Sequence, residues 1–248
     1  MLELNKLYHM DCMEGMKQFP DGYFELAIVD PPYGVGAITF MPGQRISGVG
    51  GYIDRYEVSV AVFGAKTSAR GSQPLDINHG LNSKSTIKAF GDFNEAPPPA
   101  YFAELFRVSR NQLIFGGNYF LLPPSRGFAI WRKTNVPFNF SMAMCEYIWT
   151  SFATNAKIFE ANPQGKPGER IHPTQKPVKL YQQLIAHYAK PGDKILDTHV
   201  GSGSSLIACR DAGHDCIGFE MNEEYHAAAS KRIQEAERTT PCPSSPKP

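Results

Sequence analysis

Short apolar runs bounded by turn-forming residues recur along the chain. The clearest cover residues 25–30, 112–117, 128–131, 146–152, 194–197 and 216–220. Runs of this length are typical of strands that are buried on both faces of a sheet. Apolar positions at helical spacing lie between several of them, over residues 98–108, 177–188, 204–211 and 222–237. The pattern predicts strands and helices, respectively, at these places.

Strands that alternate with helices predict an α/β fold with a doubly wound, mostly parallel sheet. We expect a single domain over residues 1–238 and a disordered tail, TTPCPSSPKP, over 239–248. Residues 34–95 contain ten glycines and little periodicity, so we expect a mobile insertion at about 35–95 that closes over a ligand. Residues 153–176 are polar and are expected to form an exposed loop.

The composition is that of a globular protein. The chain has 248 residues, 42% of them hydrophobic, which is enough for one sizeable core. The chain has no apolar run of about 18 residues, so no membrane span is expected. The five cysteines form no CxxC pair and the N-terminus has no signal-peptide pattern, which favours a cytoplasmic protein with reduced thiols. No HExxH or paired Cys/His spacing suggests a metal.

Charge is distributed unevenly, although the net charge is only +1. Residues 126–190 hold nine Lys and Arg against three Asp and Glu, and residues 44–89 hold six against three. Such stretches can contact phosphates, but an ordinary solvated face has the same composition.

Residues 194–220 combine a strand, a glycine turn, a helix, a second strand and an acid. Gly201 and Gly203 would let the backbone approach a ligand closely, and Glu220 could accept hydrogen bonds from two ribose hydroxyls. Leu206 stands where a dinucleotide fingerprint needs its third glycine, and the P-loop lysine is missing. The segment therefore predicts a ligand with an adenosine but no phosphates, such as S-adenosylmethionine.

The sequence Asp30-Pro31-Pro32-Tyr33 directly follows a predicted buried strand. The prolines fix the backbone, so Asp30 sits rigidly at the carboxyl end of the strand, where ligands of such sheets bind. The Asp30 carboxylate and the Pro31 carbonyl could hold both N–H bonds of an amino group on a heteroaromatic base, and the ring of Tyr33 could stack on that base. These residues predict methyl transfer to an exocyclic amino group.

Together these motifs resemble those of amino-methylating DNA methyltransferases. Asp30–Tyr33 resembles their catalytic motif and residues 197–203 their S-adenosylmethionine loop. The segments 10–17, 107–120 and 171–177 also resemble family sequence. The catalytic motif precedes the cofactor loop, as in the circularly permuted β group. This resemblance implies a methylase of the restriction-modification type that acts on double-stranded DNA, as a homodimer, and flips its target base out of the helix. The chain is too short for a nuclease domain as well, so we expect a stand-alone methylase.

The resemblance favours adenine N6, because Asp before Pro-Pro-Tyr is more usual for adenine and Ser for cytosine N4. Cytosine N4 stays open as an alternative, as do an RNA or protein substrate and a catalytically decayed nucleic-acid-binding protein. A cytosine-C5 enzyme needs a cysteine nucleophile, and the only Pro-Cys pair is Pro241-Cys242 in the tail.

The resemblance also implies roles for individual residues. Asp11 and Cys12 would contact the adenine of the cofactor, and Glu220 its ribose. Lys176 would face its carboxylate, or alternatively solvent. His199 replaces a phenylalanine that packs on the cofactor, and we expect it still to stack there. The full cofactor-binding set is Asp11, Cys12, Asp30, Thr174, Gln175, Lys176, Asp197, His199, Gly201, Gly203, Ser204, Ser205 and Glu220. Target recognition is expected in a loop at about 153–171, and the candidate DNA contacts are Arg126, Arg132, Lys133, Lys157, Lys166 and Arg170.

Overall fold

The structure is a computed structural model that describes residues 1–34, 95–137, 143–163 and 170–239. Each predicted strand is present: β2 (Phe24–Val29), β3 (Ser109–Phe115), β4 (Phe128–Lys133), β5 (Cys145–Thr150), β7 (Ile195–Asp197) and β8 (Cys216–Glu220). Each predicted helix is present as well: α3 (Pro99–Val108), α4 (Val178–Tyr188), α5 (Ser204–Asp211) and α6 (Glu223–Thr239). The predicted insertion, apart from Glu95, and the tail beyond Thr239 lie outside the described residues.

Four further elements appear that the apolar pattern did not predict. They are β1 (Lys6–His9), α1 (Cys12–Met16), the 3-10 helix η3 (Gly117–Tyr119) and β6 (Lys157–Ala161). The prediction of an exposed loop over 153–176 is therefore wrong in part, because β6 pairs in parallel with β4 along its whole length. As the last strand of the sheet, β6 is largely exposed, and its residues do not form an apolar run.

The eight strands of the described part of the chain form one sheet in the order β1-β8-β7-β2-β3-β5-β4-β6. Only β5 runs antiparallel to its neighbours, so the predicted mostly parallel sheet is confirmed. From β7 the chain proceeds to β8 on one side, and from β2 it proceeds to β3 on the other. The carboxyl ends of β7 and β2 therefore flank the topological switch point, which is where α/β sheets of this kind bind their ligands.

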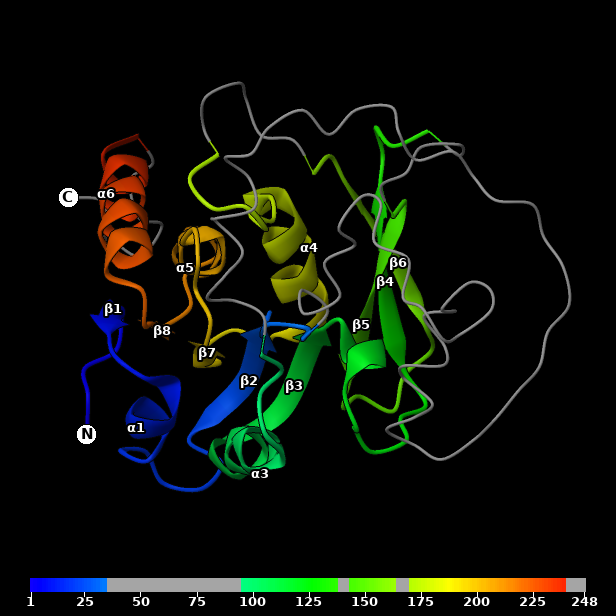
Figure 1. Cartoon of the computed structure of the whole chain (residues 1–248), viewed down its shortest axis with the longest axis horizontal. Helices are drawn as coiled ribbons and strands as arrows, with labels where there is room; N and C mark the ends of the chain where they lie inside the picture. Colours follow the sequence, from blue (N-terminus) through cyan, green and yellow to red (C-terminus); the bar gives the residue numbers. More distant parts are fainter. Residues whose placement is uncertain (35–94, 138–142, 164–169, 240–248) are drawn as a thin grey trace, which may run out of the picture.

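Helices cover both faces of the sheet (Figure 1), as the prediction of a doubly wound fold requires. Helices α4, α5 and α6 lie on one face, and α1 and α3 lie on the other. Along β2, Leu26 and Ile28 pack into the apolar cluster under α4 and α5, whereas Ala27 and Val29 pack into the cluster under α3. Because successive side chains of a strand point to opposite faces, β2 is fixed between two cores. Asp30 follows directly after it.

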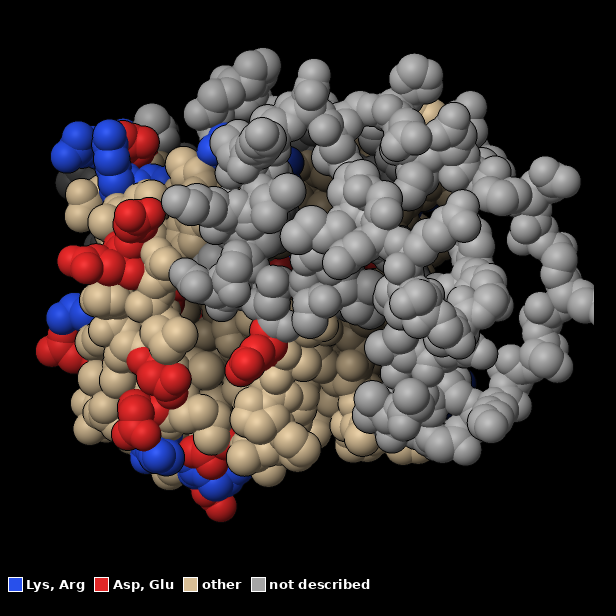
Figure 2. Space-filling model, in the orientation of Figure 1, with Lys and Arg blue, Asp and Glu red and all other residues tan. Residues whose placement is uncertain are grey.

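Acidic side chains gather around β1 and α1 on the face shown in Figure 2, and basic ones gather at the C-terminal end of α6. The basic segment 126–190 begins at the other end of the sheet, at β4, β5 and β6. Within the described ranges, no helix is both long enough and apolar enough to cross a membrane. The same residues contain no group of three or more His, Cys, Asp or Glu side chains that could hold a metal ion.

Candidate active site

Asp30 lies at the carboxyl end of β2 and is held by two side chains. The Tyr33 hydroxyl donates a hydrogen bond of 2.7 Å to Asp30 Oδ1. The Lys176 ammonium forms an ion pair with Asp30 Oδ2 and lies 3.5 Å from the Tyr33 hydroxyl. Lys176 is only 5% exposed, so the alternative in which this lysine faces solvent is wrong. The predicted catalytic motif and the segment that precedes α4 thus meet at one carboxylate.

A second carboxylate, Glu146 of β5, faces the same ammonium. Its Oε2 lies 3.5 Å from Lys176 Nζ, and its Oε1 lies 2.7 Å from Lys133 Nζ. Lys133 is buried and held by this contact, so the prediction that it contacts DNA is wrong. Glu146 is not among the site residues predicted from the sequence. It could have been identified as a single acidic residue within an otherwise largely apolar strand.

The four groups Asp30, Lys176, Glu146 and Lys133 form a chain of alternating charge in which the two lysines are buried and the two acids are partly buried. Burial lowers the pKa of Lys176, but the carboxylates of Asp30 and Glu146 outweigh it and raise that pKa above its ordinary value. Burial alone would raise the pKa of Glu146. The ammonium groups of Lys176 and Lys133 have the larger, opposite effect, so the net pKa lies below its ordinary value. Both residues are therefore charged at neutral pH.

Aromatic rings surround Tyr33. The Tyr119 ring stacks on it at a centroid distance of 4.9 Å and an interplanar angle of 17°, and Tyr119 is itself half exposed. Gly116 has φ +64°, and a Cβ added there would lie 2.3 Å from Tyr33 Cε1. Only glycine fits this position, because it tolerates the positive φ and adds no atom against the ring.

The glycine loop between β7 and α5 is organised by two buried acids. Asp197 accepts hydrogen bonds from the His199 backbone N–H at 2.9 Å and from the Ser205 hydroxyl. Glu220 accepts from the backbone N–H groups of Gly201 and Asn222, each at 2.9 Å. These contacts fix the loop beside the carboxyl ends of β7 and β8.

Helix α6 packs against the glycine loop between β7 and α5. Arg232 donates to the Ser202 carbonyl at 2.7 Å and to the Ser204 hydroxyl at 2.8 Å. Gly203 has φ +79°, and a Cβ added there would lie 3.1 Å from Ile233 Cγ1. Glycine therefore allows both the turn and the approach of α6. Arg232 is not among the site residues predicted from the sequence.

His199 lies partly buried in this loop. Its Nδ1 is 2.9 Å from the Thr198 hydroxyl, and its ring meets Tyr101 edge to face at a centroid distance of 5.3 Å. Tyr101, from α3, also bonds to the Thr198 hydroxyl at 2.6 Å. Burial lowers the pKa of His199 to about 4, so the ring is neutral at physiological pH.

Asp30, Asp197 and Glu220 make this edge of the sheet electronegative. Burial raises the pKa of Asp197 to about 7, and the nearby charges of Asp30 and Glu220 act in the same direction. A positively charged ligand would offset this concentration of carboxylates.

The remaining cofactor candidates lie around the same edge. Asp11 caps α1 by accepting from the Met13 backbone N–H at 2.7 Å, and its charge acts on His199. Cys12 is partly buried; burial raises its thiol pKa to about 12, with smaller contributions from Asp11 and Asp197. Gln175 accepts from the Ile171 backbone N–H at 3.0 Å, and Thr174 is exposed.

The other candidate DNA contacts are more accessible. Lys157 and Arg170 are exposed, and Arg170 donates to the carbonyls of His172 and Pro173. Arg126 contacts Asn155 at 3.3 Å, and Arg132 pairs with Glu160 at 3.2 Å on the surface. Lys166 lies outside the described residues.

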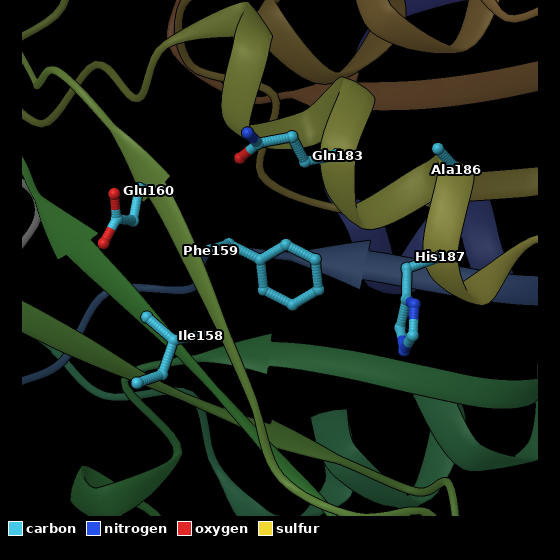
Figure 3. A pocket seen from close by; sticks show the side chains of 6 residues that line it. All are labelled: Ile158, Phe159, Glu160, Gln183, Ala186 and His187. Atoms are coloured by element: carbon cyan, nitrogen blue, oxygen red, sulfur yellow. The ribbon is translucent and has the colours of Figure 1, made fainter.

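An open hollow lies elsewhere, between β6 and α4, with the Phe159 ring facing the helix (Figure 3). Its lining residues are Ile158, Phe159, Glu160, Gln183, Ala186 and His187. None of the predicted catalytic or cofactor-binding residues lines this hollow, so we do not assign it to the candidate site.

Comparisons with known proteins agree with the fold and the motifs. A family model described as DNA methylase, of the N6/N4 type, matches residues 125–231. The type II methyltransferase M.HinfI of Haemophilus influenzae is 25% identical over 94% of this chain and 69% of its own length. The structure of the M1.HpyAVI–SAM complex aligns with a TM-score of 0.50 at 20% identity, over 92% of this chain and 98% of that one. The cytosine-N4-specific PvuII DNA methyltransferase aligns with a TM-score of 0.52 at 13% identity, over 94% and 91%.

The structural alignments show the methyltransferase fold, and the sequence matches extend along most of the chain. Over residues 125–231 the chain is similar to the N6/N4 DNA methylases, and the match to M.HinfI extends that similarity along most of the chain.

Proposed function

We propose that the chain transfers a methyl group from S-adenosylmethionine to the N6 amino group of adenine in double-stranded DNA. The position of Asp30 carries this proposal. It is a carboxylate at the carboxyl end of β2, held by Tyr33 and Lys176, and close enough to Asp197 of the glycine loop to affect its charge. In this proposal Asp30 would lie between the target base and the methyl donor.

Asp30 and Pro31 would act on the target amine. The nitrogen lone pair of such an amine is delocalised into the ring, so the amine is a weak nucleophile. When the Asp30 carboxylate and the Pro31 carbonyl accept its two N–H bonds, they stabilise the positive charge that grows on nitrogen during attack. Tyr33, whose hydroxyl is fixed on Asp30, would present its ring to the flipped base.

The acids of the glycine loop fit S-adenosylmethionine. Glu220 would accept hydrogen bonds from the ribose hydroxyls, using lone pairs left beside its two backbone contacts. Asp197 and His199 would lie along the methionine side of the site. When bound, S-adenosylmethionine supplies a methyl group on a positively charged sulfur, which suits the electronegative edge formed by Asp30, Asp197 and Glu220. Exposed basic residues would contact DNA phosphates; the candidates are Arg126, Arg132, Lys157 and Arg170.

The choice of base rests on Asp30 itself. Asp before Pro-Pro-Tyr favours adenine within the family that the motifs resemble. The fold shared with a cytosine-N4-specific enzyme keeps cytosine as the second candidate. Both bases present an exocyclic amino group, and the acceptors in this site fit either one.

The test is incubation with S-adenosylmethionine and unmethylated genomic DNA, followed by digestion to nucleosides and mass spectrometry. We expect N6-methyladenine from the wild type. Asp30→Asn should reduce its formation by about a hundred-fold or more, because the uncharged amide stabilises the developing charge poorly. N4-methylcytosine would correct the base and leave the mechanism intact. If the protein binds S-adenosylmethionine but methylates neither base, the assignment to DNA is wrong.

A further inference from the structure

The Lys176 ammonium lies between two carboxylates in the interior. It is paired with Asp30 Oδ2, and Glu146 Oε2 lies 3.5 Å away on the other side. The Lys176 side chain is only 4% exposed. Glu146 Oε2 is buried and accepts no hydrogen bond from any residue that the structure describes. The ammonium is thus bound to one carboxylate, that of Asp30, and lies beside a second acceptor, Glu146 Oε2, that has no hydrogen bond among the described residues.

We propose that Glu146 is a positioning residue for methyl transfer: its Oε2 receives the Lys176 ammonium when a target amine takes its place on Asp30. This inference rests on the proposed function, and it assigns a role to a residue that no sequence motif marks. Lys176 would then alternate between two carboxylates, on Asp30 before the base arrives and on Glu146 while Asp30 holds the amine.

An exchange would free an acceptor site on Asp30, because each of its oxygens already has a protein donor. Oδ1 accepts from the Tyr33 hydroxyl at 2.7 Å, and Oδ2 is paired with Lys176. An ammonium that stays on Oδ2 competes with the N–H of the amine. It also neutralises the charge that should stabilise the transition state.

Glu146 is suited to receive the ammonium for two reasons. A buried ammonium that leaves its partner without a new one suffers a large desolvation penalty, and a carboxylate 3.5 Å away removes that penalty. Lys133 holds Glu146 Oε1 at 2.7 Å, so the acceptor is fixed in place. Two ammonium groups and two carboxylates balance in charge whichever carboxylate Lys176 contacts.

The first experiment does not depend on catalysis. Lysine side chains labelled with ¹³C are titrated by NMR in the wild type and in Glu146→Gln, and the Lys176 signal is assigned from its loss in Lys176→Arg. Without the Glu146 charge, Lys176 should titrate about one pH unit lower or more. Other titratable groups near Lys176 are Asp30, Tyr33 and His172, and the substitution leaves them in place.

The second experiment measures single-turnover methylation and the affinity for S-adenosylmethionine. Glu146→Gln should slow methyl transfer by about ten- to a hundred-fold, the range expected for losing one hydrogen bond to a charged group. Its affinity for S-adenosylmethionine should stay within about two-fold, a difference well below 1 kcal/mol. Glu146→Asp, which keeps the charge, should recover part of the rate.

Glu25→Gln is the matched control. Glu25 lies on β2, pairs with Lys194 at 3.0 Å and has a side chain 23% exposed, the same as that of Glu146. This variant loses a comparable ion pair away from Asp30, so its methylation rate and its Lys176 titration should match the wild type.

If Glu146→Gln matches Glu25→Gln in both the methylation rate and the Lys176 titration, the proposal is overturned. A slow rate that Glu146→Asp fails to improve, with an unchanged titration, would also overturn it, because a structural defect then suffices. If the wild type methylates no DNA, the proposed function fails. The lysine titration then decides alone whether Glu146 is an acceptor for Lys176.

Discussion

His199 shows what a single residue can change in this site. It stands where the resembling enzymes have a phenylalanine that packs on the methyl donor. Its Nδ1 contacts the Thr198 hydroxyl, which Tyr101 also holds, so Thr198 keeps one partner without the imidazole. Since burial lowers the pKa of His199 to about 4, the ring enters the site uncharged, and a phenyl ring can replace it.

We predict that His199→Phe preserves or tightens the binding of S-adenosylmethionine, because the phenyl ring packs equally well and carries no nitrogen to desolvate. Isothermal titration calorimetry at pH 7.5 on both proteins measures this. A loss of affinity of about ten-fold or more, equal to 1.4 kcal/mol, would mean that the imidazole makes a polar contact essential for binding.

Residues whose chemistry is local in sequence could be identified from the sequence alone. Asp30 and Tyr33 lie within one turn after a strand, so their neighbours in the chain suffice to suggest a role. The partnership of Lys176 with Asp30 joins positions 146 residues apart. Only the packing of the segment before α4 against the carboxyl end of β2 brings them together. The stacking of Tyr119 on Tyr33 could not be predicted from the sequence either, because it depends on the path of η3 after β3.

At the scale of elements, the turn after β3 controls the Tyr33 ring. Gly116 has φ +64°, and a methyl group there would lie 2.3 Å from Tyr33 Cε1. Gly116→Ala should therefore displace Tyr33 from Asp30 as well as strain the backbone. We predict a fall in the methylation rate of about ten-fold or more, since misplacement of about 1 Å can cost more than that.

Gly213→Ala is the control, because it strains the backbone without displacing a neighbouring side chain. Gly213 has φ +75°, and a Cβ added there has no neighbour within 4 Å. Both variants should lose stability, by about 1 kcal/mol for the backbone conformation alone. Only Gly116→Ala should lose activity beyond its loss of folded protein. Equal specific activities of the two, measured at a temperature where both are folded, would show that Tyr33 adapts.

Some of the strands found from the sequence share a property that the missed end strands lack. Strands β2 and β8 are covered on both faces and appear as continuous apolar runs. β1 and β6 are the end strands of the sheet and are largely exposed. Their sequences contain polar residues and therefore show no continuous apolar run. Helix α1 has only five residues, too few to show a helical period.

At the scale of the whole molecule, the sheet order decides which motifs can cooperate. The Asp30 motif and the glycine loop are separated by most of the chain, and the pairing of β2 with β7 places them at one edge. The segment before α4 then adds Lys176, and β5 adds Glu146. The permuted order of the motifs therefore does not prevent assembly of the site, because parallel strands present their carboxyl ends together whatever their order along the chain.

The buried carboxylate of Asp197 links this site to the stability of the whole protein. Burial raises its pKa from 3.8 to about 7, so between these values the folded protein binds one more proton than the unfolded chain. The contribution of Asp197 to the free energy of unfolding therefore falls as the pH rises from about 4 to about 7, by roughly 1.4 kcal/mol per pH unit, and is constant above.

Asp197→Asn removes this titration and keeps a side chain of similar shape. We predict that the free energy of unfolding of the wild type minus that of the variant falls between pH 5 and pH 7 and is level from pH 7.5 to pH 9. His172 and His199, with pKa values lowered to about 4, act in the opposite direction, because they lose stability as the pH falls. Both proteins contain these histidines, so their effect cancels in the difference. Urea unfolding at each pH gives the two free energies. A difference independent of pH would mean that Asp197 is ionised throughout, stabilised by the His199 backbone N–H and the Ser205 hydroxyl more strongly than burial opposes it.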